Sequence, residues 1–155
     1  MMTRGKRLAE AIERSVSGPM WHGPALADLL EGVTPDQAAA KPIAGAHSIW
    51  ELVLHMTSWT NIVRSRLGPN KAQEPTPDMD FPPIRGTGPD EWRTAIQHLK
   101  EAKHGLAADV AELRDDDFKR IVPGRDHSVA VMLHGLIEHD VYHGGQIAIL
   151  KKALA

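Results

Sequence analysis

The 155-residue chain contains no cysteine. Disulfides, thiolate zinc sites and cysteine nucleophiles are therefore excluded together, and any thiol in the chemistry must come from a ligand. An excess of charge is also lacking, because 18 Lys and Arg against 20 Asp and Glu leave a net charge of −2. No block of like charge occurs either, so we expect neither nucleic acid nor an acidic membrane surface as a partner.

Long apolar runs are absent as well. No stretch of about 18 apolar residues occurs, and the N-terminal MMTRGKRLAEAIERS lacks the apolar region of a secretory signal. We therefore expect a cytoplasmic protein without a membrane span. The composition, with 42% hydrophobic and 25% charged residues, is that of an ordinary globular protein, and the length favours a single domain over residues 1–155.

Apolar residues recur at helical spacing in four segments, and no segment alternates as a strand. They predict helices over about 3–17 and 48–67, a third from Pro89 to the acidic run at 115–117, and a last one that continues to about Leu154. Ser48 and Glu51 form a capping box for the second helix, and Asp126 or Ser128 can cap the last.

The connections between these helices differ in length. A short apolar run after Pro24 is interpreted as the first helix resuming after a kink, and one helical turn is expected at 35–37. Residues 68–89 contain six prolines, too many to hold a helix, so this stretch is interpreted as a crossover. Four long helices with one long crossover predict an all-α four-helix bundle of up-down-down-up topology, in which helices two and three run parallel.

The chain is rich in histidine, with nine residues. At about 100° per residue, His139 and His143 fall on or beside the apolar face of the last helix, whereas His134 lies opposite. His55 lies within the apolar arc of the second helix. Four further histidines are expected either to be solvated, on the third helix, or to lie at or cap the start of a helix: His98 and His104, and His47 and His127.

Three inward imidazoles would repel one another if protonated, and each costs free energy unless its nitrogens are engaged. A divalent metal resolves both problems, because His139 and His143 are one turn apart and His55 supplies a third ligand from a facing helix. Three neutral ligands leave a coordination position open, as in catalytic sites. The alternative, three satisfied core histidines, stays open at this point.

Rival motifs fit less well. The segment HDVYH (139–143) resembles the HExxH helix of zinc proteases, but Asp140 replaces the glutamate and no downstream ligand follows. A phosphohydrolase of the HD type needs a further aspartate, which is missing too. Glu101 and His104 have the ExxH spacing of di-iron bundles, yet they lie off the core stripe. No phosphate loop or GxSxG elbow occurs.

Aromatic positions carry weaker signals. Trp59 and Trp92 are most simply core residues, whereas Trp50 and Leu54 form a second apolar surface that a dimer interface can use. The Pro-rich crossover is interpreted as an ordinary surface loop, with a cover over the histidines as the alternative.

Two segments, HSIWELVLHMTSW (47–59) and IEHDVYHGGQIAILKKAL (137–154), together with the WHG turn at 21–23, resemble the DinB / YfiT-like superfamily of metal-dependent hydrolases and thiol transferases. The resemblance implies an up-down-down-up four-helix bundle, often a homodimer. It also implies that His55, His139 and His143 bind a divalent metal, zinc or nickel.

The function that we expect from this resemblance is the transfer of a low-molecular-weight thiol, of the bacillithiol, mycothiol or glutathione type, to an electrophilic small molecule. Asp140 and Gln146 are expected to orient a ligand imidazole or accept a proton, or else to pack as a polar cluster. Trp21, His22 and Trp59 are candidates for substrate binding. A hydrolase that activates water and a non-catalytic metal- or ligand-binding module are the alternatives.

Overall fold

The computed structural model describes residues 1–155, and all of its regular structure is helical. The eight helices are α1 (Arg4–Ser17), α2 (Leu26–Leu30), α3 (Pro35–Ala39), α4 (Ile49–Ser65), α5 (Pro77–Asp80), α6 (Pro89–Ala111), α7 (Asp115–Lys119) and α8 (Val129–Ala153). Strands are absent apart from two isolated bridges. The all-α class is therefore confirmed. None of the helices is both long and apolar enough to cross a bilayer.

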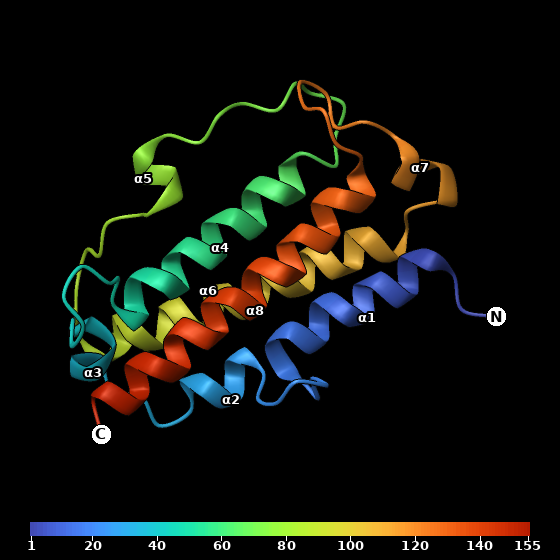
Figure 1. The fold of residues 1–155 in the computed structure, drawn as a ribbon. Coiled ribbons are helices and arrows are strands. Elements are labelled where there is room, and N and C mark those ends of the chain that lie inside the picture. Colours follow the sequence, from blue (N-terminus) through green and yellow to red (C-terminus); the bar gives the residue numbers. More distant parts are fainter.

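The four long helices α1, α4, α6 and α8 build the body of the molecule (Figure 1). α6 packs against α1 and α4, and α8 packs against α4 and α1. Figure 1 shows that α4 and α6 run in one direction and that α1 and α8 run in the opposite one. The segment between α4 and α6 returns along α4, which allows two consecutive helices to point the same way.

Local signals start and end these helices. The Ser48 hydroxyl accepts from the Glu51 backbone N–H at 3.1 Å, and the Glu51 carboxylate accepts from the Ser48 N–H at 2.7 Å, so the predicted capping box is confirmed. Ser128, and not Asp126, caps α8. α1 ends at Ser17 and is followed by Gly18, whose φ of +66° suits glycine. The chain then turns, so α2 is a separate helix and the predicted resumption of α1 is wrong.

The Pro-rich crossover does contain a helix, against the prediction. The short α5 begins where Pro77 occupies the first turn, a position at which the missing N–H costs nothing. The Thr76 hydroxyl caps it by accepting from the Met79 N–H at 3.3 Å.

The acidic run at 115–117 does not end the third long helix, as predicted; α6 already ends at Ala111 and these residues begin α7. Carboxylates favour the positive N-terminal end of a helix. Asp117 also accepts from the Arg114 backbone N–H at 2.9 Å, which satisfies a donor at the start of α7.

The second apolar surface predicted for α4 is buried within the chain. Trp50 is 2% exposed, and its ring lies 5.0 Å from that of Trp92, whose indole N–H donates to the Val33 carbonyl at 2.8 Å. Leu54 packs, half-buried, against the same core cluster. Trp50 therefore provides no free face, and the prediction of an exposed second apolar surface on α4 is wrong.

Candidate metal centre

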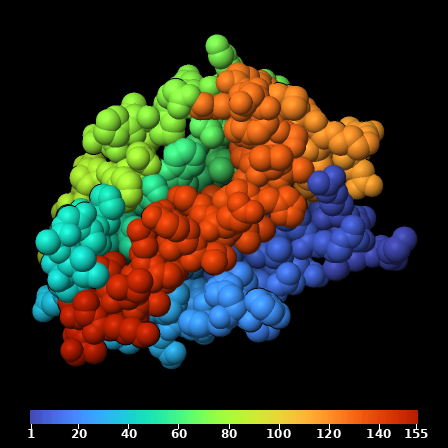
Figure 2. All heavy atoms as spheres, viewed as in Figure 1, coloured from blue at the N-terminus to red at the C-terminus, as the bar shows by residue number.

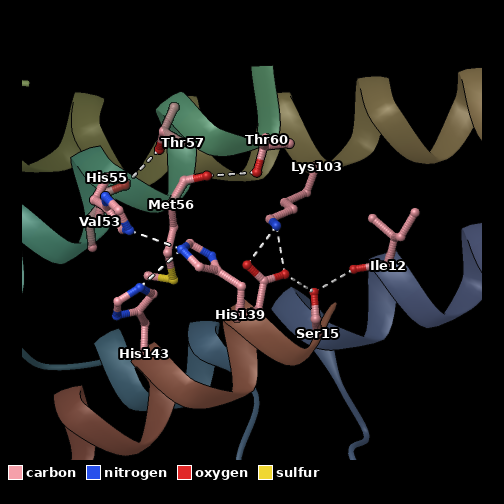
Figure 3. Close-up of polar contacts among 11 residues, drawn as sticks. Ile12, Ser15, Val53, His55, Met56, Thr57, Thr60, Lys103, His139 and His143 are labelled. Atoms are coloured by element: carbon pink, nitrogen blue, oxygen red, sulfur yellow. Dashed lines mark hydrogen bonds and ion pairs between the residues drawn. The ribbon is translucent and has the colours of Figure 1, made fainter. Parts of the chain in front are cut away.

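Three histidines from two helices converge between α4 and α8 (Figure 3). His55 lies in the middle of α4, and His139 and His143 are one turn apart on α8. The His139 Nε2 lies 2.9 Å from His55 Nε2 and 3.1 Å from His143 Nε2. One nitrogen from each ring lies within 4.8 Å of the others, and no other group of three such side chains comes together in the structure.

The opposite nitrogens of two rings are held by acceptors. His55 Nδ1 donates to the Asp80 backbone carbonyl at 2.6 Å, and His143 Nδ1 donates to Gln146 Oε1 at 2.6 Å. Protonation at Nδ1 leaves the Nε2 lone pair free, so both rings present a lone pair to the shared point. His139 Nδ1 is buried and has no acceptor.

Burial keeps these rings neutral. It lowers the pKa of His55 and of His143 below the usual value near 6.5. Burial, reinforced by the neighbouring His143 and His55, lowers the pKa of His139 to about 3. At neutral pH the cluster is therefore a set of three uncharged bases.

This donor set fits a divalent metal. Nitrogens bound to one zinc ion at about 2.0–2.1 Å lie roughly 3.3 Å apart in tetrahedral geometry. The 2.9 and 3.1 Å separations of the Nε2 atoms are close to that value. Neutral imidazole nitrogen also suits nickel and other transition metals, so the donors alone select no single ion.

The crossover covers this cluster, so its interpretation as an ordinary surface loop is wrong. The Phe81 ring, directly after α5, stacks on His55 at 4.1 Å between ring centroids and on His47 at 3.8 Å. Asp80 supplies the carbonyl that holds His55, and its carboxylate accepts from the Trp59 indole N–H at 2.8 Å. Asp80 thus holds the crossover against α4, and the Phe81 ring covers His55.

Sequence reasoning missed Asp80 and Phe81. Neither lies on a periodic helix face, and their role depends on how far the crossover folds back along α4. The only signal in the sequence was an aromatic residue among prolines.

The Asp140 side chain belongs to a different polar cluster from the one that the three histidines form. Its carboxylate is buried and accepts from Lys103 Nζ at 2.6 and 2.7 Å and from the Ser15 hydroxyl at 2.9 Å. Asp140 therefore contacts an ammonium and a hydroxyl, whereas Gln146 contacts a candidate ligand imidazole.

Lys103 was also missed, and the signal for it was available. It is completely buried on α6, four residues after Leu99 and three before Leu106, within the apolar stripe. Burial lowers the pKa of Lys103, and the Asp140 carboxylate opposes that shift. A lysine in the middle of a buried stripe requires a buried acid as its partner.

The three predicted substrate-binding residues lie in different places. The Trp59 ring is half-buried, 6.1 Å from the His139 ring, and so borders the cluster. Trp21 is fully exposed in the turn before α2. His22 lines a pocket of about 300 Å³ together with Asp140 and Gly144, and none of the three clustered histidines lines it.

The other histidines lie at the surface or at helix starts. His134 is exposed, as are His98 and His104, in agreement with the helical wheel. Glu101 is exposed as well, so the ExxH pair forms no site.

Comparison with known proteins agrees with this geometry. Residues 21–147 match the sequence model of the DinB superfamily, and this range includes His55, His139 and His143. Searches of curated proteins and of solved structures found no match. Since the matched range covers well over half of the chain and carries the whole histidine cluster, the chain belongs to the DinB superfamily.

Proposed function

We propose that the protein is a metal-dependent enzyme that transfers a low-molecular-weight thiol, of the bacillithiol, mycothiol or glutathione type, to an electrophilic small molecule. Zinc or nickel is the proposed metal, held by His55, His139 and His143. The observation that carries the proposal is the convergence of three neutral Nε2 atoms, two of them aimed by acceptors on Nδ1. Such a set leaves a position open for a reactant.

A divalent metal bound to three imidazoles lowers the pKa of a thiol or a water molecule that coordinates it, and so provides a nucleophile at neutral pH. A chain without cysteine leaves the thiol to a second molecule. This supports transfer from a soluble thiol over chemistry on a protein sulfur.

The residues around the cluster have separate tasks in this proposal. The Asp80 carbonyl and Gln146 orient His55 and His143 through their Nδ1 atoms. Phe81 covers His55 and excludes water from that side, while Trp59 borders the space next to His139. Trp21 and His22 are proposed to contact the outer part of a substrate.

We also propose that α1, α4, α6 and α8 form the up-down-down-up bundle of the family and that the protein is a homodimer. The helix directions in Figure 1 support the topology. With the Trp50 surface buried, the exposed apolar residues of α8 are the better candidates for a dimer interface: Val131, Tyr142 and Ile149.

A thiol-consumption screen tests the activity. Zinc- or nickel-loaded protein is mixed with each of the three thiols and a panel of electrophiles, and loss of free thiol is measured. We expect consumption with wild type and with His134→Ala, whose side chain is exposed, and none with His139→Ala. Turnover of esters or amides without any thiol would replace this proposal by a hydrolase. If no substrate is turned over with or without thiol, the protein would instead be a non-catalytic metal- or ligand-binding module.

A further inference from the structure

A pair of arginines lies where α4 ends and the crossover begins. Arg66, the C-terminal cap of α4, is only 7% exposed. Arg125 lies in the segment before α8 and contacts the same part of the crossover as Arg66. Both donate to one backbone carbonyl, that of Gln73, at 3.2 Å from Arg66 and 2.9 Å from Arg125.

The charges of this pair are not balanced by the chain. Arg66 forms no ion pair, and the one nearby acid, Glu74, is bound to Arg125 and is itself 80% exposed. Arg125 Nε is buried without an acceptor. Burial and the neighbouring Arg125 lower the pKa of Arg66, which reflects the same imbalance. Two guanidinium groups against one carboxylate leave a single positive charge in excess.

A buried guanidinium is costly unless it is paired, and a neutral carbonyl does not supply the missing charge. The shared contact with Gln73 explains how the arginines anchor the crossover. The negative C-terminal end of α4 and the face of the Trp59 ring both favour a cation at Arg66, but neither supplies a full negative charge. An anion is the partner that this arrangement lacks.

Trp59 connects the arginines to the candidate metal centre. The Arg66 guanidinium carbon lies 5.6 Å from the centroid of the Trp59 ring, and the same ring is 6.1 Å from that of His139. Figure 2 shows a hollow on this face, with α4 (green) visible at its bottom between the crossover (lime) and the segment that leads into α8 (orange). The Trp59 ring is thus the element shared by the two groups, and a small molecule packed against it comes near both Arg66 and His139.

We propose that Arg66 and Arg125 bind a carboxylate group of the small molecule that reaches the histidine cluster. Guanidinium groups bind carboxylates through two parallel hydrogen bonds. The single excess charge matches a carboxylate better than a phosphate, which carries close to two negative charges at neutral pH. The inference rests on the proposed function in treating that molecule as a reactant, whereas the binding itself requires no metal.

Acetate is the probe, and the protein is freed of metal with a chelator so that acetate cannot bind a metal instead. The side-chain Nε–Hε signals of Arg66 and Arg125 are followed by NMR as acetate is added at constant ionic strength. We expect both signals to shift, and phosphate and chloride to shift them less. Arg66→Gln is expected to weaken acetate binding at least about tenfold, because a charge-assisted hydrogen-bond pair is lost.

Arg64→Gln is the matched control, since Arg64 lies two residues earlier on α4, is exposed and pairs with Asp109. It should bind acetate as wild type does. Arg66→Lys retains the charge and replaces Arg66→Gln if that variant does not fold; it too should bind acetate more weakly than wild type, because the planar fork is lost.

Absence of acetate-induced shifts, equal affinity in wild type and the Arg66 variant, or stronger binding of phosphate would each overturn the inference. Metal content is measured on the same preparations before chelation. Wild type that lacks metal yet binds acetate contradicts the proposed function and leaves the arginine site in place. Wild type that holds metal but ignores acetate contradicts the arginine site alone.

Discussion

Two buried polar clusters lie next to each other among the long helices, and neighbouring residues of α8 belong to them (Figure 3). Asp140 belongs to the ion pair with Lys103, in which both carboxylate oxygens accept hydrogen bonds. His139 belongs to the histidine cluster, in which Nε2 atoms face one another and the His139 Nδ1 has no acceptor. The first cluster is complete within the chain and the second is not.

This difference separates a structural role from a functional one. A buried polar group without a partner costs free energy, and His139 Nδ1 is such a group. An ion pair whose members satisfy each other can remain for packing and specificity alone. The incomplete cluster is therefore the one that we assign to a ligand.

The largest expected effect comes from breaking the complete cluster. Lys103→Met leaves the Asp140 carboxylate buried without its cation, and we expect the free energy of unfolding to fall by about 3–5 kcal/mol. Urea denaturation of wild type and variant measures this change.

The double variant Lys103→Met/Asp140→Leu should recover most of the loss, because no charge then stays buried. Lys100→Met, at an exposed position on the same helix, is the control and should change stability little. A loss below about 1 kcal/mol in Lys103→Met would show that the pair is not buried as described.

The second effect concerns pH and the incomplete cluster. The folded-state pKa of His139 is about 3, whereas an unfolded histidine titrates near 6.5. Between these pH values the unfolded chain binds a proton at His139 and the folded chain does not. The free energy of unfolding of metal-free protein should therefore fall as pH falls from about 6.5 toward 3. Thermal unfolding at a series of pH values measures it.

His139→Leu removes this titration and should make the stability profile less steep over the same pH range; the lowered pKa values of His55 and His143 account for the slope that remains. In the metal-free state it should also be at least as stable as wild type, because the unpartnered Nδ1 is gone. An unchanged slope in the variant would mean that His139 is not the group responsible.

The smallest expected effect concerns Gln146, which contacts His143 at the edge of the histidine cluster. Gln146→Ala removes the acceptor on His143 Nδ1, and we expect metal affinity to fall about tenfold while the fold stays intact. Competition with a chromogenic chelator gives the affinity. Gln97→Ala, at an exposed position on α6, should bind metal like wild type; equal loss in both variants would contradict an orienting role for Gln146.

Periodicity and capping were sufficient for much of this account. The four long helices and the inward direction of His55, His139 and His143 follow from the 3.6-residue repeat, and Ser48 with Glu51 marked the start of α4. These features depend on residues close together in the sequence.

What the sequence did not reveal depends on contacts between distant segments. Trp50 was expected at the surface, since nothing local indicates that Trp92 covers it. Phe81 reaches His55 only because the crossover folds back along α4. Lys103 was overlooked because its partner Asp140 lies on another helix, although its place in the apolar stripe was visible.

The central claim is that His55, His139 and His143 hold a metal ion. Elemental analysis of protein purified without an affinity tag tests it most directly. The account predicts close to one zinc or nickel per chain in wild type and in His134→Ala, and a strongly reduced content in His143→Ala with helical signal retained. Equal metal content in all three proteins, or none in wild type after incubation with either ion, would contradict it.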